Sequence, residues 1–303
     1  MFRILMVTLL LLPAANPAVA QAAAETQKAV LVTGASTGIG RKITEHLAAK
    51  GYFVYAGARK QADLDALSAI RNVQSIRLDV TRPDDIDAAV VTITKAGRGL
   101  YGLVNNAGIA TVGNSTETSV EEFTLIMDVN LYGPWRVTRA FAPLIIASKG
   151  RITTIGSISG ILAARDLTAY SMSKHAMEAF ADSTALQMAP LGVQVSIVEP
   201  GNFDSDIGKS ATKRTGRENR FTDRSKYKKP DEVAAAVEQA LFEATPKRRY
   251  MVTPDQKEAE ITIRKQIEQL VQLNEGHPYT YDRAALIKML DEALATARPK
   301  TGS

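Results

Sequence analysis

The chain has 303 residues, of which 45% are hydrophobic and 23% charged, and this composition excludes a wholly disordered or collagen-like protein. It has no cysteine and only three histidines, so disulfide bonds and thiolate chemistry are excluded and no metal site is predicted. The length allows one large α/β domain or two small ones.

The first 20 residues are predicted to be a leader that is separate from the fold. Arg3 gives a positively charged start, residues 4–12 are almost all apolar, and the small residues Ala18 and Ala20 predict cleavage before Gln21. The apolar run is shorter than the roughly 20 residues that span a bilayer. A cleaved signal peptide is the favoured interpretation, while an uncleaved membrane anchor and a misassigned start stay open. The first two predict an exported, periplasmic or membrane-anchored protein, and the third predicts a cytoplasmic one.

Short apolar runs alternate with longer amphipathic segments from residue 28 to residue 252. The apolar runs predict strands at 28–32, 52–56, 74–78, 100–104, 151–155, 193–198 and 249–252. The amphipathic segments predict helices at 39–50, 61–70, 83–96, 119–148, 168–191 and 230–243. This alternation predicts α/β architecture with a single Rossmann-type, doubly wound parallel sheet and helices on both faces. No linker separates the segments, so we predict one domain over 28–252.

A helical extension is predicted after that domain, over residues 253–303. Its two amphipathic segments, 255–273 and 282–297, are separated by Gly276 and Pro278, which end and restart helices.

Positive charge is concentrated in residues 206–229. This stretch holds nine Lys and Arg residues against three acidic ones, a net charge of +6, so the rest of the chain is almost neutral. A solvated, mobile loop is the favoured interpretation, and a lid over an anionic group or a contact with nucleic acid or acidic lipid are the alternatives. The chain lacks a recognition-helix pattern and a basic stripe with interleaved aromatics, so no nucleic-acid partner is predicted.

A glycine-rich turn follows the first predicted strand directly. Gly34 permits a tight turn, Gly38 lets backbone approach a pyrophosphate, and Gly40 lets the next helix pack closely on the sheet. The N-terminus of that helix offers free N–H groups and partial positive charge to phosphates. The turn therefore predicts a dinucleotide site, which also includes the intervening residues Ser36, Thr37 and Ile39.

The end of the second strand indicates which dinucleotide is bound. An acid that would accept hydrogen bonds from the adenosine ribose is expected there, but Ala58 occupies the position and Arg59 and Lys60 follow. A guanidinium suits a 2′-phosphate. We therefore favour NADP (NADPH) as the cofactor, with NAD possible, and the alternative is that the two basic residues only begin a solvated helix.

Several motifs in order resemble the short-chain dehydrogenase/reductase family, from residue 28 to about 205 and more loosely to about 252. The resemblance implies that Asp79 and Val80 contact the adenine ring, and that 28–252 is a dinucleotide-binding and catalytic domain. It also implies cofactor contacts from two other segments, Asn106-Ala107-Gly108 and Pro200-Gly201. The family often has Thr four residues after that last Gly, against the nicotinamide carboxamide, and Ser205 stands there in this chain.

The family's Tyr-x-x-x-Lys motif is present as Tyr170 and Lys174, which a helix would place on one face. A nearby ammonium and an oxidised nicotinamide both favour the phenolate, so Tyr170 is the expected general acid and base. Ser157 would hold the substrate oxygen. By resemblance, Lys174 also holds the nicotinamide ribose, and Asn130 holds a water that links Lys174 to solvent.

These residues predict hydride transfer between a nicotinamide cofactor and a small-molecule secondary alcohol or ketone. Apolar residues in the expected substrate region, including Ile161, Leu162 and Phe203, favour a hydrophobic substrate, whereas the basic stretch would suit an anionic handle. The alternative is a non-catalytic dinucleotide-binding sensor on the same fold. The resemblance also implies a homodimer or homotetramer that pairs through the helices at 119–148 and 168–191.

Overall fold

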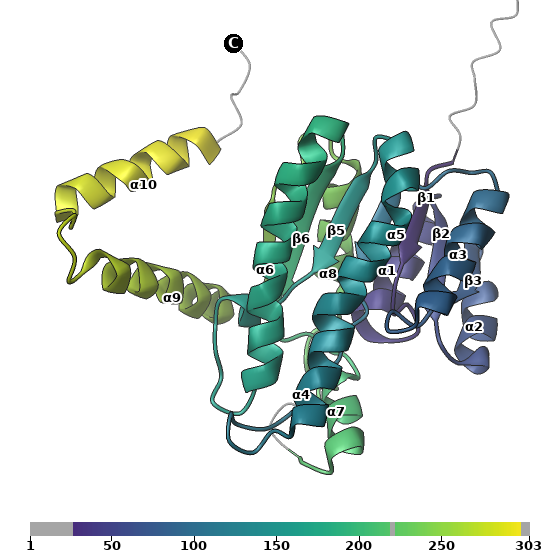
Figure 1. Cartoon of the computed structure of the whole chain (residues 1–303), viewed down its shortest axis with the longest axis horizontal. Helices are drawn as coiled ribbons and strands as arrows, with labels where there is room; N and C mark the ends of the chain where they lie inside the picture. Colours follow the sequence, from purple (N-terminus) through teal and green to yellow (C-terminus); the bar gives the residue numbers. More distant parts are fainter. Residues whose placement is uncertain (1–26, 219–221, 298–303) are drawn as a thin grey trace, which may run out of the picture.

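A computed structural model describes residues 27–218 and 222–297, so the predicted leader lies outside the described residues. One sheet of seven parallel strands runs through the structure in the order β3-β2-β1-β4-β5-β6-β7 (Figure 1). The strands are β1 (Ala29–Val32), β2 (Phe53–Ala58), β3 (Val73–Arg77), β4 (Gly102–Asn105), β5 (Arg151–Ile155), β6 (Gln194–Pro200) and β7 (Arg249–Val252). β1 pairs with β2 on one side and β4 on the other. The strand order reverses at this point, where doubly wound sheets bind ligands.

Helices cover both faces of the sheet, which confirms the predicted fold class. One hydrophobic core joins the sheet to α1 (Gly38–Ala49), α2 (Gln61–Ser68) and α8 (Asp231–Phe242). A second core, on the other face, joins it to α3 (Pro83–Lys95), α5 (Gly133–Ala147) and α6 (Thr168–Met188). The central strands β1 and β4 are buried at every residue, as expected for strands covered on both faces, whereas the edge strands β3 and β7 each have one buried residue.

The helix predicted over 119–148 is correct in extent but not regular. It consists of α4 (Val120–Met127), a π-helical segment (Asp128–Tyr132) and α5. Ser119 caps it, since its hydroxyl accepts a hydrogen bond from the Glu122 N–H at 3.2 Å. Pro134 has no N–H to give to the Asn130 carbonyl, so the α-helical bonding breaks there. Asn130 therefore lies in a π-helical segment, a feature often found at functional sites.

The prediction of a loop throughout 206–229 is wrong, because Ile207–Thr215 forms the helix α7. The high charge of this stretch hides its helical period, since only Gly208 and Ala211 are buried in α7. Residues 219–221 lie outside the described residues.

The two predicted C-terminal helices are present as α9 (Gln256–Asn274) and α10 (Arg283–Ala297). The first turns of α9 contact the rest of the fold through Glu258, while the rest of α9 and α10 extend away from the sheet (Figure 1). Among residues 27–218 and 222–297, no helix combines the length and the apolar character that crossing a bilayer requires.

Candidate active site

A cleft of about 1360 Å³ opens at the carboxyl ends of the strands. It brings together segments between residues 34 and 261, and every predicted cofactor-binding and catalytic residue lines it except Asn130. Of the apolar residues expected in the substrate region, Leu162 lines the cleft, but Ile161 and Phe203 do not. Phe203 is instead buried in the hydrophobic core beside α1 and α8. The predicted residues that line it are Gly34, Ser36, Thr37, Gly38, Ile39, Gly40, Arg59, Asp79, Val80, Asn106, Ala107, Gly108, Ser157, Tyr170, Lys174, Pro200, Gly201 and Ser205.

The glycine turn at the start of α1 requires glycine for two different reasons. Gly34 has φ +64°, and a Cβ there would lie 2.8 Å from the Ala107 Cα. Gly40 has ordinary backbone angles, but a Cβ would collide with the Asn106 side chain and the Gly34 carbonyl. The turn therefore presents bare backbone and the α1 N-terminus to the cleft.

Thr33 holds this turn to the end of β4, a role that the sequence reasoning missed. Its hydroxyl oxygen accepts hydrogen bonds from the N–H groups of Asn106 and Ala107, each at 3.0 Å. The Asn106 side-chain amide donates in return to the carbonyls of Thr33 at 2.9 Å and Gly34 at 3.0 Å. Two of the predicted cofactor segments thus form one rigid unit.

Asp79 and Arg59 lie together at another part of the cleft. Asp79 Oδ1 accepts hydrogen bonds from the Thr81 N–H at 3.0 Å and hydroxyl at 2.7 Å. Burial raises the pKa of Asp79, but the bonds from Thr81 and the charge of Arg59 outweigh burial, so the pKa lies below its ordinary value. The Arg59 guanidinium is 3.7 Å from the other carboxylate oxygen, and its side chain is 64% exposed. It therefore remains accessible at the cleft edge beside a charged carboxylate.

Lys174 and Tyr170 lie on one face of α6, with the Lys174 Nζ 5.7 Å from the centre of the tyrosine ring. Lys174 is buried, and its Nζ donates a hydrogen bond to the Ile155 carbonyl at 2.9 Å. Ser157 follows β5, and its Oγ accepts a hydrogen bond from the Ser159 N–H at 3.0 Å. A hydroxyl, a phenol and an ammonium therefore converge on the cleft.

Asn130 lies behind the cleft rather than in its lining. Its side-chain amide makes two hydrogen bonds to the backbone of Ile109. Oδ1 accepts from the Ile109 N–H at 2.8 Å, and Nδ2 donates to the Ile109 carbonyl at 2.9 Å. Nδ2 also donates to the Ser173 hydroxyl at 3.0 Å. A Cβ on Gly108 would lie 3.5 Å from Asn130 Oδ1 and 3.9 Å from Lys174 Nζ, so both groups flank Gly108.

A buried pair of carboxyl groups, Glu178 and Glu199, lies next to these residues and was not singled out from the sequence. Arg249 Nε is 3.3 Å from Glu178 Oε2 and 3.6 Å from Glu199 Oε1. Burial raises the pKa of Glu199 to about 8, and the facing Glu178 adds to the rise while Arg249 opposes it. Glu178 is one helical turn beyond Lys174 and Glu199 precedes Pro200, so a carboxyl group with a raised pKa lies directly behind two residues of the cleft lining.

The substrate half of the cleft, by which we mean its walls from 158–167, α7 and the start of α9, combines apolar and basic residues. Leu162, Leu167, Ile207 and Ile261 supply apolar surface. Glu258 of α9 accepts hydrogen bonds from the Asn202 N–H at 2.9 Å and side-chain amide at 2.6 Å. The contribution of α9 was missed because nothing in its sequence marks it as part of a site.

The glycine turn leaves space in the cleft for the phosphates of a dinucleotide. A side chain at Gly34 or Gly40 would fill the turn, and the α1 N-terminus faces the space that they leave. No group of three or more metal-ligating side chains occurs in the part of the chain that the structure describes.

The parallel sheet and the site at its reversal point define a nucleotide-binding protein of the doubly wound α/β class. A sequence profile of the family described as short chain dehydrogenase matches residues 28–216. The chain is 30% identical over 237 residues to "Uncharacterized oxidoreductase YbbO" of Escherichia coli K12, covering 75% of this chain and 86% of that protein. The chain therefore belongs to the short-chain dehydrogenase/reductase family.

Other relatives are named as dehydrogenases. The chain is 40% identical over 194 residues to the mitochondrial D-beta-hydroxybutyrate dehydrogenase of Rattus norvegicus, covering 60% of this chain but only 56% of the rat protein. Among solved structures, a short-chain dehydrogenase from Streptomyces avermitilis has a TM-score of 0.71 and 28% identity, over 90% of this chain and 100% of that one. An alcohol dehydrogenase from Thermococcus sibiricus complexed with 5-hydroxy-NADP has a TM-score of 0.66 and 26% identity, over 75% and 96% of the two chains.

Proposed function

We propose that the protein transfers a hydride between a nicotinamide dinucleotide, preferably NADP, and a secondary alcohol or ketone of hydrophobic character. The observation that carries the proposal is the convergence of Ser157, Tyr170 and Lys174 on a cleft that also holds the glycine turn. The nicotinamide ring, when bound, supplies the hydride chemistry. The residues named below supply the binding, the orientation and the proton.

Tyr170 would exchange the proton with the substrate oxygen, because its phenol lines the cleft on the same helical face as the Lys174 ammonium. Ser157 accepts a hydrogen bond from Ser159, which leaves its O–H to donate to the substrate oxygen. Lys174 would stabilise the phenolate by its charge, and Asn130 would keep the segment after β4 in place through its bonds to Ile109.

The preference for NADP rests on Arg59, whose exposed guanidinium stands at the end of β2 beside Lys60. A 2′-phosphate there would compete with Asp79 for the guanidinium and bind it with charge assistance. The relative from Thermococcus sibiricus, solved with 5-hydroxy-NADP, supports the same preference. The hydrophobic character of the substrate rests on the apolar walls of the substrate half.

The direct test is a panel of aliphatic, aromatic and steroid ketones, each assayed with NADPH and with NADH. We expect oxidation of NADPH with at least one hydrophobic ketone, and a lower rate with NADH. Tight binding of NADPH without turnover on any member of the panel would contradict the proposal and favour the non-catalytic sensor. Oxidation of a 3-hydroxy acid with the oxidised cofactors would also be assayed, because the rat relative is named for that reaction.

We also infer that residues 1–20 direct the protein out of the cytoplasm and that it assembles as a homodimer or homotetramer. Support for export comes from the charge and apolar run of the leader. N-terminal sequencing of the mature protein should begin at Gln21, and recovery of Met1 would refute cleavage. Light scattering should give two or four times the mass of one chain.

A further inference from the structure

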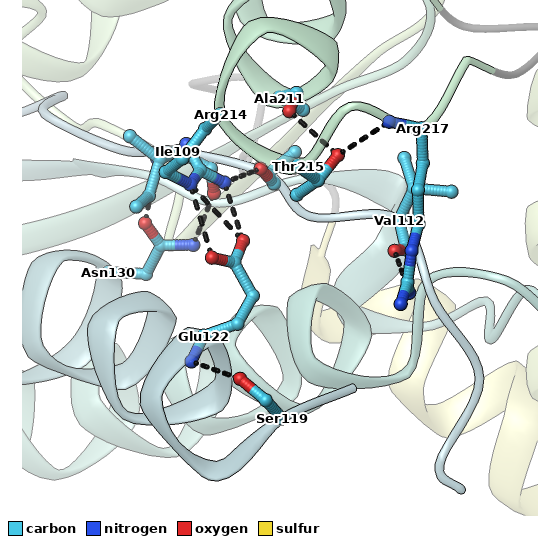
Figure 2. A network of polar contacts seen from close by, with 10 residues as sticks. Ile109, Val112, Ser119, Glu122, Asn130, Ala211, Arg214, Thr215 and Arg217 are labelled. Atoms are coloured by element: carbon cyan, nitrogen blue, oxygen red, sulfur yellow. Dashed lines mark hydrogen bonds and ion pairs between the residues drawn. The ribbon is translucent and has the colours of Figure 1, made fainter. Parts of the chain in front are cut away.

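An ion pair joins Arg214 of α7, which lines the cleft, to Glu122 of α4 (Figure 2). Arg214, in the last turn of α7, places Nη2 2.9 Å and Nε 3.1 Å from Oε1 of Glu122. The two residues are 92 positions apart in the chain, and their side chains are only 26% and 19% exposed. The pair is therefore a tertiary contact between two helices that are far apart in the sequence.

The same guanidinium reaches toward the candidate catalytic residues. Arg214 Nη2 donates a hydrogen bond to the Ala110 carbonyl, immediately after Ile109, the residue that Asn130 clamps (Figure 2). Asn130 in turn donates to the Ser173 hydroxyl, which donates to the Tyr170 carbonyl at 2.7 Å. Arg214 is thus connected to the backbone of α6 through the backbone of Ile109 and Ala110, Asn130 and Ser173, but not to the Tyr170 phenol.

Glu122 is held in the charged form that this contact needs. Burial raises the pKa of its carboxyl, but the hydrogen bond from Arg214 and the charges of Arg214 and Arg217 outweigh burial, so the pKa lies below its ordinary value. Glu122 also lies in the first turn of α4, where the helix dipole favours a negative charge. Loss of the arginine would leave a largely buried carboxylate without its cation.

Arg217 makes a second, weaker connection on the same side. Its Nη1 donates to the Val112 carbonyl at 3.2 Å (Figure 2). Its Nη2 donates to the Glu117 carbonyl at 3.4 Å. Both arginines therefore bind the segment between β4 and α4, while Lys209 and Lys213 on the same stretch line the cleft.

We propose that Arg214 is a positioning residue that holds α7 against the segment after β4, and so fixes the substrate half of the cleft before any substrate binds. The proposal rests on the proposed function, because it assigns the wall next to α7 to the substrate. The glycine turn and Arg59 make no bond to Arg214, so the cofactor half should not depend on it. An arginine is required because its planar guanidinium donates hydrogen bonds to the Glu122 carboxylate and the Ala110 carbonyl at the same time.

The kinetic test compares Arg214→Gln and Arg214→Lys with Arg136→Gln. Arg136 makes an ion pair of similar burial with Asp128, at 2.7 Å and with exposures of 28% and 30%, but does not line the cleft. We expect Arg214→Gln to raise KM for the ketone about tenfold while kcat and the Kd for NADPH change less than about threefold. Lysine can pair with Glu122 but cannot reproduce the fork, so Arg214→Lys should fall between wild type and Arg214→Gln.

Hydrogen exchange of the α7 backbone amides gives a readout that needs no activity. In Arg214→Gln these amides should exchange faster than in wild type, and in Arg136→Gln they should not. Unchanged exchange in Arg214→Gln, or a fall in kcat with KM unchanged, would overturn the proposal. Faster exchange in a protein that reduces no ketone would support the role of Arg214 and refute the proposed function instead.

Discussion

The two halves of the cleft are built in different ways. The cofactor half, made of residues 34–40, the end of β2 and residues 106–108, uses bare backbone and contacts between segments that directly follow strands. The substrate half depends on side-chain pairs between remote segments, such as Arg214 with Glu122 and Asn202 with Glu258, 92 and 56 positions apart. The cofactor half should therefore tolerate few substitutions, while the substrate half can change its walls without losing the dinucleotide.

The largest expected effect is at the junction of the two halves, where Tyr170 faces both. Tyr170→Phe should lower kcat by roughly 10²–10⁴-fold, because the proton donor is lost. The Kd for NADPH should stay within about threefold, since the glycine turn is untouched. Tyr101→Phe, which changes a phenol outside the cleft lining, is the matched control. Steady-state assays and fluorescence titration would check both, and full activity in Tyr170→Phe would refute its role.

The cofactor half is tested next by Gly34→Ala, with Gly97→Ala as its control. Both glycines have positive φ, +64° and +67°, but a Cβ on Gly34 meets Ala107 whereas a Cβ on Gly97 meets nothing within 4 Å. Backbone strain should cost each variant about 1 kcal/mol of stability. Gly34→Ala should lose more than Gly97→Ala, because its Cβ also meets the Ala107 backbone. Only Gly34→Ala should weaken NADPH binding, by about tenfold or more. Equal NADPH affinity in the two variants would contradict the dinucleotide turn.

A smaller effect is expected at the edge of the cofactor half. Arg59→Glu should weaken NADPH binding about tenfold and leave NADH binding nearly unchanged, since only NADPH carries the 2′-phosphate. Arg77→Glu introduces the same charge at a similarly exposed residue outside the cleft lining. Competition titrations with both cofactors would measure the selectivity, and an equal loss for NADH would exclude the phosphate contact.

The last prediction concerns stability rather than activity or binding, and it involves Glu199 of β6. The folded protein keeps its proton up to about pH 8, whereas the ordinary value is 4.5, so the folded state binds more protons between these limits. The free energy of unfolding of the wild type should therefore fall as pH rises from about 5 to 8. The free energy of unfolding of Glu199→Gln should fall less over that pH range. Urea unfolding at several pH values would test this, and identical pH dependences would rule out the shift.

The difference between the halves also explains what the sequence could predict. The strands and the glycine turn follow from local patterns, because apolar runs and a strand–turn–helix glycine spacing are visible within a few residues. The π-helical segment around Asn130 and the helix α7 were not predicted, since Pro134 and a run of charges give no helix-period signal. The contacts of Glu122 with Arg214 and of Glu258 with Asn202 could not be predicted, because a pair of side chains far apart in the sequence leaves no local pattern. The roles of the individual site residues stay predictions, as does the division into a leader, a domain over 28–252 and an extension over 253–303.

The central claim is that this cleft holds a nicotinamide dinucleotide with its reactive ring beside Tyr170. A crystal structure of the protein with NADPH tests it most directly. We predict the pyrophosphate over the turn from Gly34 to Gly40, the 2′-phosphate at Arg59 and the nicotinamide against Tyr170 and Ser157. A dinucleotide bound elsewhere, or with its nicotinamide turned away from the Tyr170 hydroxyl, would contradict the account.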